Sequence, residues 1–177
     1  MEINIPRDIK LFVGCLYTSK ENLASAIKEL EKYFGIVDLE SEDFPFDVTN
    51  YYEKEMGRSI KRKFFSFSKL FNPIYLLDAK LITNEVEKTF SIEGKRSVNL
   101  DVGYMDFDKV VLASAKYCIH KIYIGRGIYA DMTLHYEKGQ YYPYPWAFPD
   151  FKLDRYYRFF LKMREIYKKQ MKERKRF

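Results

Sequence analysis

Two stretches of the chain alternate apolar and polar residues, and each has a carboxylate on its polar side. A two-residue period is typical of a strand with one buried face. Side chains that point the same way on neighbouring strands lie about 5 Å apart, so these polar groups would converge if the two strands are close. The polar positions are Asn99 and Asp101 in residues 98–104, and Asp131, Thr133 and His135 in residues 128–136.

A shared site of Asp101 and Asp131 would suit a magnesium ion, because Mg²⁺ is bound through oxygen ligands such as carboxylates. We therefore take Asp101 and Asp131 as candidate metal ligands and Mg²⁺ as a candidate cofactor. The alternative is an ordinary sheet face that only meets solvent. The choice depends on whether the two strands are neighbours.

An acidic, aromatic segment comes earlier in the chain. Residues 38–55 hold seven carboxylates against one base, and Pro45 interrupts them. The lack of sustained periodicity predicts a loop, and a long loop in a compact domain is often functional. The candidate ligand-binding residues in it are Asp47, Tyr52, Glu53 and Glu55, unless these groups serve only to solvate the loop.

Positive charge near the second polar strand suggests an anionic ligand. Lys116, His120 and Arg126 all lie between residues 116 and 126. Such groups bind phosphate or carboxylate through charge-assisted hydrogen bonds. Either histidine could instead be structural. With the acidic loop and the polar strands, these residues favour a polar, acidic cleft that binds or acts on a phosphate-bearing small molecule, with nucleotides included in that class.

The elements that must position these residues follow a strand, helix, strand, strand, helix, strand order. This is the split βαβ order of ferredoxin-like domains. We therefore expect an α+β fold with a ferredoxin-like βαββαβ core at about residues 8–105. The expected elements are strand 9–17, helix 18–34, strand 36–39, strand 58–70, helix 72–90 and strand 98–104.

The remaining chain predicts an antiparallel β extension at about residues 106–145 and a C-terminal amphipathic helix at about residues 152–174. In the extension, Gly125-Arg126-Gly127 predicts a tight turn between two strands. Alternation places the apolar residues from Ile128 to Tyr136 on one face. At 177 residues the chain is long enough for one domain and too short for two ordinary ones, so we expect a single domain over residues 1–177.

Local signals predict the helix ends. Thr18 and Glu21 fit a capping box at the start of the first helix, and Gly35 is a natural left-handed stop. Asn72-Pro73 is a good start for the second helix.

The second helix carries a polar row at i, i+4 and i+7, made of Lys80, Asn84 and Glu87. Such rows usually face water, and that is the prediction here. Asn84 is nevertheless included among the candidate ligand-binding residues.

Several chemistries lack a signal. The chain has no Gly-x-x-x-x-Gly-Lys-Ser/Thr loop to wrap phosphates. Cys15 and Cys118 are predicted to be two reduced, buried thiols, since they form no Cys-x-x-Cys pair. No apolar run approaches the roughly 20 residues that span a bilayer, and we expect a cytoplasmic protein without a membrane partner.

The positive charge of the chain lies at its C-terminal end. The formal net charge is +6, and residues 152–177 hold eleven Lys/Arg against three Asp/Glu. An RNA partner would therefore depend on the C-terminal helix and on exposed aromatic residues. The alternative for this helix is a merely solvated basic face.

Six segments of the chain together carry a resemblance to a known family. They are Lys10-Leu11-Phe12-Val13-Gly14, Phe44-Pro45-Phe46-Asp47, Tyr51-Tyr52-Glu53-Lys54-Glu55-Met56-Gly57, Thr83-Asn84, Val98-Asn99-Leu100-Asp101-Val102-Gly103-Tyr104 and the segment from His120 to Thr133. On these segments the chain resembles a bacterial family catalogued as domain of unknown function 4416, over nearly its whole length. Some relatives are labelled GTP-binding protein, but the resemblance implies no mechanism. The chain departs from the family pattern at Val102, where the pattern has Pro.

Three functional hypotheses follow. The first is a ligand-binding protein or enzyme for a phosphate-bearing small molecule, with Mg²⁺ as a candidate cofactor. The second is a non-catalytic RNA-binding or ribonucleoprotein-associated module. The third is an interaction protein that oligomerises, and the sequence leaves open whether the protein is an enzyme.

Overall fold

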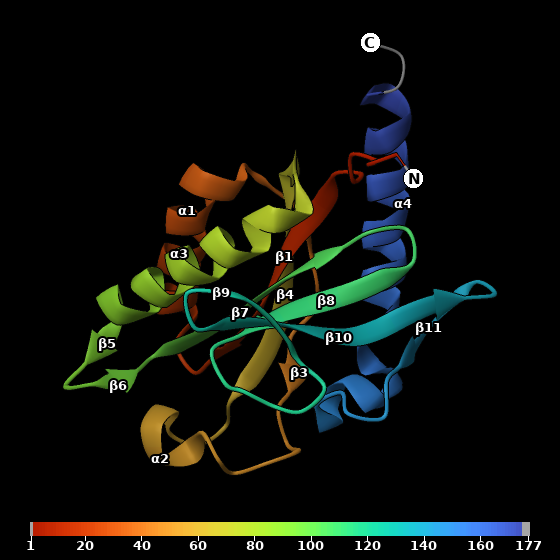
Figure 1. The fold of residues 1–177 in the computed structure, drawn as a ribbon. Coiled ribbons are helices and arrows are strands. Elements are labelled where there is room, and N and C mark those ends of the chain that lie inside the picture. The colour runs from red at the N-terminus through yellow and green to blue at the C-terminus, as the bar shows by residue number, and fades with distance from the viewer. Residues whose placement is uncertain (1, 175–177) are drawn as a thin grey trace.

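A computed structural model describes residues 2–174, and its centre is a nine-stranded antiparallel sheet. The strand order is β11-β10-β8-β7-β1-β4-β2, while β3 pairs with β4 and β9 pairs with β10 (Figure 1). A separate hairpin joins β5 (Ser91–Ile92) to β6 (Lys95–Arg96). The strands of the sheet are β1 (Ile9–Tyr17), β2 (Val37–Glu40), β3 (Phe44–Pro45), β4 (Lys61–Phe71), β7 (Val98–Met105), β8 (Lys109–Ser114), β9 (Ile122–Gly125), β10 (Ile128–Glu137) and β11 (Gln140–Pro143).

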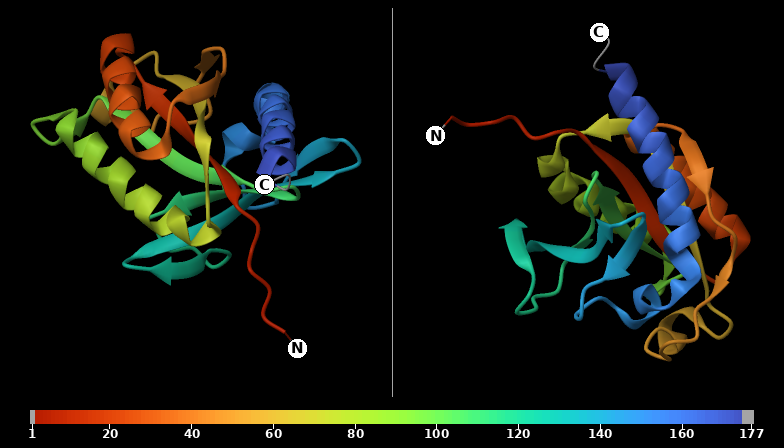
Figure 2. Two further views of the ribbon diagram at one scale, coloured as in Figure 1. Left: turned by 90° about the horizontal axis from the view of Figure 1, so that it is seen from above. Right: turned by 90° about the vertical axis from the view of Figure 1, so that its right-hand side faces the viewer.

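Helices cover both faces of the sheet. The helices α1 (Lys20–Phe34) and α3 (Leu76–Thr89) lie side by side on one face, and α4 (Tyr157–Arg174) lies on the other (Figure 2). The short helix α2 (Glu53–Met56) lies in the connection from β3 to β4. Single turns of 3-10 helix, η1 (Pro73–Tyr75), η2 (Pro149–Lys152) and η3 (Asp154–Tyr156), lead into α3 and α4. The mixed α+β prediction is therefore confirmed.

The continuous apolar run of β1 is explained by burial on both sides. Leu11, Val13 and Cys15 pack into the core under α1 and α3. Phe12 points the other way and packs into a second core with Phe160 of α4. Because β1 is central and covered on both faces, it has no need of an alternating polar pattern.

The predicted helix boundaries are close to those observed, with one correction. The capping residue of α1 is Ser19 and not Thr18, because the Ser19 hydroxyl accepts the hydrogen bond from the backbone N–H of Asn22. Gly35 ends α1 with a φ of 88°, as predicted. Asn72 accepts from the backbone N–H of Ile74, although the first turn is 3-10 and α3 follows it.

A β-bulge in β10 overturns the prediction of a single apolar face from Ile128 to Tyr136. The register with β8 shifts between Met132 and Leu134, so the extra residue is Thr133. As a result Ile128 packs into the α1/α3 core, whereas Leu134 packs into the α4 core. A bulge inserts one residue into the ladder and reverses the side of every residue that follows it.

The predicted turn Gly125-Arg126-Gly127 joins β9 to β10. All three residues have positive φ angles of 116°, 51° and 78°. Glycine adopts this conformation without strain, which explains why two glycines surround the arginine at the tip. The Arg126 guanidinium reaches Asp78 of α3 at 3.2 Å.

The polar row of α3 is not solvent-facing, which is a third correction. Lys80 and Glu87 are buried. The Lys80 ammonium donates to the backbone carbonyl of Leu100 at 3.1 Å, and the Glu87 carboxylate accepts from the backbone N–H of Leu100. β8 pairs with β7 only from Gly103 onward, so these two side chains satisfy the backbone of an otherwise unpaired strand edge.

A fully buried lysine ties α4 to the sheet. The Lys10 ammonium donates to Asp38 of β2 at 2.5 Å, to the carbonyl of Phe67 at 2.8 Å and to Gln170 of α4 at 3.1 Å. All three of its donors therefore have acceptors. Burial lowers the pKa of Lys10, and the Asp38 carboxylate opposes that shift.

No helix within residues 2–174 is both long enough and apolar enough to cross a membrane.

Candidate functional site

A buried arginine joins two carboxylates on the α4 face of the sheet. Arg62 of β4 is almost fully buried, at 3% exposure. Its guanidinium donates to Asp101 of β7 at 2.8 Å and lies 3.1 Å from the carboxylate of Asp150 in η2. The Tyr156 hydroxyl donates to the same Asp150 oxygen at 3.1 Å. The arginine therefore connects the sheet with the segment that leads into α4.

Gly14 of β1 makes room for the Arg62 side chain. β1 lies between β4 and β7, so the guanidinium must cross it to reach Asp101. A Cβ atom at Gly14 would lie 3.1 Å from the guanidinium and 2.8 Å from the ring of Phe64. Only glycine allows so close an approach without displacing a neighbour. The guanidinium also lies 5.3 Å from the centroid of the Phe46 ring.

The ionic chain continues from Asp101 toward α2. Asn99 donates to Asp101 at 3.0 Å, and Arg96 donates to Asn99 at 2.6 Å. Arg96 also holds both oxygens of Glu55, at 2.6 and 2.8 Å. We call the connected residues Glu55, Arg96, Asn99, Asp101, Arg62, Asp150 and Tyr156 the Arg62 network.

The two carboxylates on Arg62 have different proton affinities. Desolvation by the surrounding protein disfavours the charged form of the Asp101 carboxylate. The positive charges of Arg62 and Lys80 outweigh this effect, so the pKa of Asp101 is lowered. Burial raises the pKa of Asp150, against the influence of Arg62. One oxygen of Asp150 is buried without a hydrogen-bond partner among the described residues. Asp101 keeps 31% of its side chain exposed, so it is the carboxylate of this pair that solvent reaches.

The exposed rim beside the network is aromatic and positively charged. The ring of Tyr52 lies 6.0 Å from the guanidinium of Arg96, and burial raises the pKa of Tyr52 to about 12. Tyr51 packs edge-on against Tyr52 at 5.0 Å between ring centroids. Lys116, in the loop after β8, donates to the Tyr51 hydroxyl at 3.3 Å and lies 4.9 Å from its ring.

A second polar cluster surrounds Asp131 of β10. Its carboxylate lies 3.7 Å from His120 and 3.6 Å from the ammonium of Lys121. Burial raises the pKa of Asp131, and Lys121 and His120 oppose that shift. Lys121 also donates to the backbone carbonyl of Lys116 at 3.4 Å. The Asp131 cluster therefore adjoins the loop that presents Lys116.

Asp101 and Asp131 do not lie on neighbouring strands, because β8 separates β7 from β10. The oxygens of Asp101 already accept from Arg62 and Asn99. Across residues 2–174, no three or more His, Cys, Asp or Glu side chains gather in a way that would hold a metal ion. The expected Mg²⁺ site of Asp101 and Asp131 therefore does not fit this arrangement.

The other predicted site residues divide into two groups. Tyr52, Glu55 and Asn99 belong to the Arg62 network or touch it, and Asn84 lines a hollow of about 310 Å³ together with Arg96. Asp47 is paired with Arg155, Glu53 is exposed on α2, and Arg126 is paired with Asp78. Thr133 is buried at the bulge and donates to the carbonyl of Asp131 at 3.1 Å. His135 stacks on Tyr142.

Sequence reasoning missed Arg62, Arg96, Asp150 and Lys121. Arg62 did carry a signal, because alternation places it on the same face of its strand as Phe64. A charged residue in such a position must find a partner when it is buried. Asp150 carried no comparable signal, since it follows an irregular aromatic loop.

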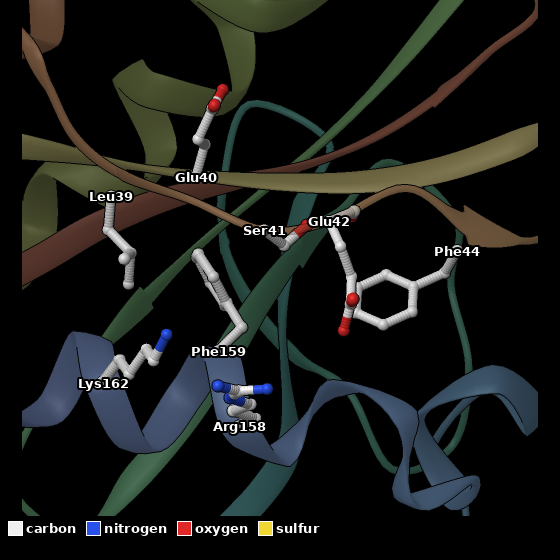
Figure 3. Close-up of a pocket in the computed structure, with 8 residues that line it drawn as sticks. All are labelled: Leu39, Glu40, Ser41, Glu42, Phe44, Arg158, Phe159 and Lys162. Atoms are coloured by element: carbon white, nitrogen blue, oxygen red, sulfur yellow. Dashed lines mark hydrogen bonds between the residues drawn. The ribbon is translucent and has the colours of Figure 1, made fainter.

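A groove lies between α4 and the segment from β2 to β3 (Figure 3). It encloses about 200 Å³, which is smaller than the roughly 300–1,000 Å³ of typical ligand pockets. Its lining mixes Glu40 and Glu42 with Arg158 and Lys162, and it contains no member of the Arg62 network. This groove is therefore a poor candidate for the ligand site.

Comparison with known proteins gives one match. The model of a family described as Domain of unknown function (DUF4416) matches residues 7–167. No curated protein matches the chain. No solved structure matches it either. Every residue of the Arg62 network, and the Asp131 cluster beside it, lies inside the matched range.

Proposed function

The chain belongs to the DUF4416 family, and we propose that it binds a phosphate-bearing small molecule on the rim formed by Lys116, Tyr51 and Tyr52. The observation that carries the proposal is that the Lys116 side chain is exposed and has no salt-bridge partner within residues 2–174. An exposed ammonium beside the ring of Tyr51 is available for an anion.

The two arginines of the Arg62 network are already neutralised. Arg62 faces Asp101 and Asp150, and the guanidinium of Arg96 is held by Glu55. A phosphate would have to displace one of these carboxylates, and the displaced carboxylate would then repel it. This favours Lys116 over the two arginines as the first contact of an anionic ligand.

The tyrosines favour a ligand with a flat ring. Tyr51 is 64% exposed, so its ring face can be covered by a ligand without unfolding anything. Stacking of a nucleobase on an aromatic side chain is worth about 1–3 kcal/mol. A nucleotide would satisfy both the ammonium and the ring, which makes it the first class to test.

The test is a thermal shift assay with ATP, GTP and inorganic phosphate, each with and without Mg²⁺. A compound that binds the folded state raises the melting temperature by mass action. We expect a nucleotide to raise it for the wild type, and Lys116→Gln to abolish that rise while leaving the melting temperature without ligand unchanged.

Lys138→Gln is the matched control, because Lys138 is also exposed but lies in the turn between β10 and β11. It should respond to nucleotide like the wild type. Equal responses of the Lys116 and Lys138 variants would contradict the assignment of the rim. The absence of any shift with all three probes would contradict the proposed ligand class.

A second candidate function is RNA binding by α4, and a specific observation favours it. Four exposed cations on α4 have no salt-bridge partner in the described part of the chain, and they recur on one side of the helix. Cations aligned in this way can contact successive phosphates. They are Arg158, Lys162, Lys169 and Lys172.

A gel-shift assay with a mixed cellular RNA pool tests this candidate. Changing Lys162, Lys169 and Lys172 to Glu should remove binding without unfolding the protein, because these side chains point away from the core. Wild-type binding should weaken steeply with salt, since binding releases counterions from the phosphates. No binding by the wild type at low salt would eliminate the candidate. Arg176, which adds to the same charge in the sequence, lies outside the described residues.

We also propose that β1, α1, β2, β4, α3 and β7 form a ferredoxin-like unit. The order β7-β1-β4-β2, with every neighbouring pair antiparallel, supports the assignment. In such a unit α1 and α3 lie on one face of the sheet and leave the other face available. Here that other face carries the Arg62 network and α4.

A further inference from the structure

A thiol, an imidazole and a carboxylate lie in line beside the proposed rim. The Cys118 sulfur lies 3.5 Å from Nδ1 of His120. Nε2 of the same ring lies 3.7 Å from Oδ1 of Asp131. The two ring nitrogens of His120 therefore face different groups: Nδ1 faces the thiol of Cys118, and Nε2 faces the carboxylate of Asp131.

This arrangement differs from a metal site. A single ion would need the three side chains to converge on one point, but Cys118 and Asp131 lie on opposite sides of the imidazole ring. A histidine that faces a thiol with one nitrogen and a carboxylate with the other can accept the thiol proton while the carboxylate orients the ring. The geometry thus favours proton transfer over metal binding.

Two local structures hold the three groups in place. Cys118 and His120 lie in one tight turn, which the backbone N–H of Lys121 closes by donating to the carbonyl of Cys118 at 3.0 Å. Asp131 comes from β10, and its Oδ1 is buried with no hydrogen-bond partner in the described part of the chain. An unpaired buried oxygen beside Nε2 is what a ring N–H at that position would satisfy.

Trp146 covers the imidazole ring. It stacks on His120 at 5.3 Å between centroids, with 21° between the ring planes. Its own position is set by a hydrogen bond from Nε1 to the carbonyl of Met132 at 2.8 Å and by stacking on Tyr144 at 4.9 Å. An aromatic cover limits water around His120 and strengthens its interaction with the carboxylate.

We propose that Cys118 is a covalent nucleophile toward acyl groups, with His120 as its base and Asp131 as a positioning residue. His120 takes the proton from the thiol, and the thiolate sulfur bonds to the acyl carbon. The bond to the leaving group breaks with its electron pair, and the leaving group takes the proton from His120. Water then cleaves the thioester, which releases the acid and restores the thiol.

Cys15 provides an internal control. It is fully buried in the α1/α3 core, and burial raises the pKa of its thiol. A buried, protonated thiol is inert toward electrophiles. Cys15 should therefore not react measurably in the folded protein. Any alkylation of a thiol at low pH then reports on Cys118.

The first test measures alkylation of the full chain by iodoacetamide between pH 5 and pH 9, with peptide mapping by mass spectrometry. An ordinary thiol has a pKa of about 8.5 and is about 1% thiolate at pH 6.5. We expect Cys118 to be alkylated about tenfold faster at pH 6.5 than an ordinary thiol with this thiolate fraction. The His120→Asn variant should lose this tenfold difference in rate. Asp131 faces the ring, and Lys121 in turn pairs with Asp131, so Asp131→Asn should shift the pH profile without abolishing alkylation.

The second test uses p-nitrophenyl acetate as an acyl donor. One equivalent of p-nitrophenolate should be released rapidly, and one acetyl group should be found on Cys118 and none on Cys15. Lys138→Gln should retain this burst. Because p-nitrophenyl acetate carries no phosphate, the burst does not depend on the anion site, so failure of that site and failure of the nucleophile are distinguishable. An ordinary pH profile that His120→Asn leaves unchanged, or acetylation only on lysines, would overturn the proposal. If His120→Asn does not fold, the wild-type profile alone decides.

Discussion

Replacing Arg62 with Met should destabilise the protein by about 3–5 kcal/mol, because removing one member of a buried ion pair leaves its partner charge without compensation. Here the loss is shared by two carboxylates, since Asp101 and Asp150 both lose the guanidinium. Asp150 is at 1% exposure and cannot turn to solvent. The free energy of unfolding, measured by urea denaturation, is the readout.

Arg158→Met is the matched control for this prediction. Arg158 is an exposed arginine on α4 without a salt-bridge partner in the described residues, so its loss should change stability by less than about 0.5 kcal/mol. Arg62→Lys should recover only part of the loss, because an ammonium cannot hold two carboxylates in the fixed fork of a guanidinium. Wild-type stability of Arg62→Met would mean that the two carboxylates do not depend on the arginine.

Replacing Asp38 with Ala should destabilise the protein by a similar amount, about 3–5 kcal/mol, because it leaves the buried ammonium of Lys10 without its counter-ion. The remaining acceptors, the carbonyl of Phe67 and the amide of Gln170, are neutral. In contrast, Lys10→Met should be much less harmful, since Asp38 is 18% exposed and retains the hydroxyl of Ser66.

The pH dependence distinguishes this ion pair from simple packing. Burial lowers the pKa of Lys10 in the folded protein, so the unfolded chain binds that proton more tightly. Stability should therefore rise with pH between the lowered pKa and the ordinary value of about 10.4. Without Asp38 the pKa falls further, and the rise should begin at a lower pH.

Glu40→Ala is the control on the same strand. Glu40 is 62% exposed and pairs with Lys63 at 3.2 Å, so the change should cost less than about 1 kcal/mol. Equal effects of the two substitutions would show that the loss comes from β2 as a strand and not from the buried lysine.

The elements with local signals were predictable from the sequence. The mostly apolar run from Ile9 to Tyr17 coincides with β1, because an apolar run of this length is typical of a buried strand. Gly35 and Asn72 mark helix ends through their own backbone preferences. The turn at Gly125 and Gly127 follows from the need for positive φ. Each of these features depends on residues that are close to one another in the sequence.

Contacts across the sheet could not be predicted in the same way. The bulge at Thr133 sends Leu134 to the opposite face from Met132, and nothing in the alternation of residues 128–136 indicates it. In the sequence, Lys80 and Glu87 have the spacing of a solvent-facing row. In the structure, both side chains bind the backbone of Leu100, where the edge of β7 is not paired with β8. In both cases the deciding partner is distant in the sequence.

The candidate site shows the same division. The sequence by itself determined which side chains are capable of chemistry, among them Asp101, Lys116 and His120. Tertiary structure alone decided that Arg62 neutralises Asp101 across Gly14, and that β8 separates Asp101 from Asp131. The physical reason is that a charge is buried or free according to the strands and helices packed around it, and strand order follows from the packing of the whole chain.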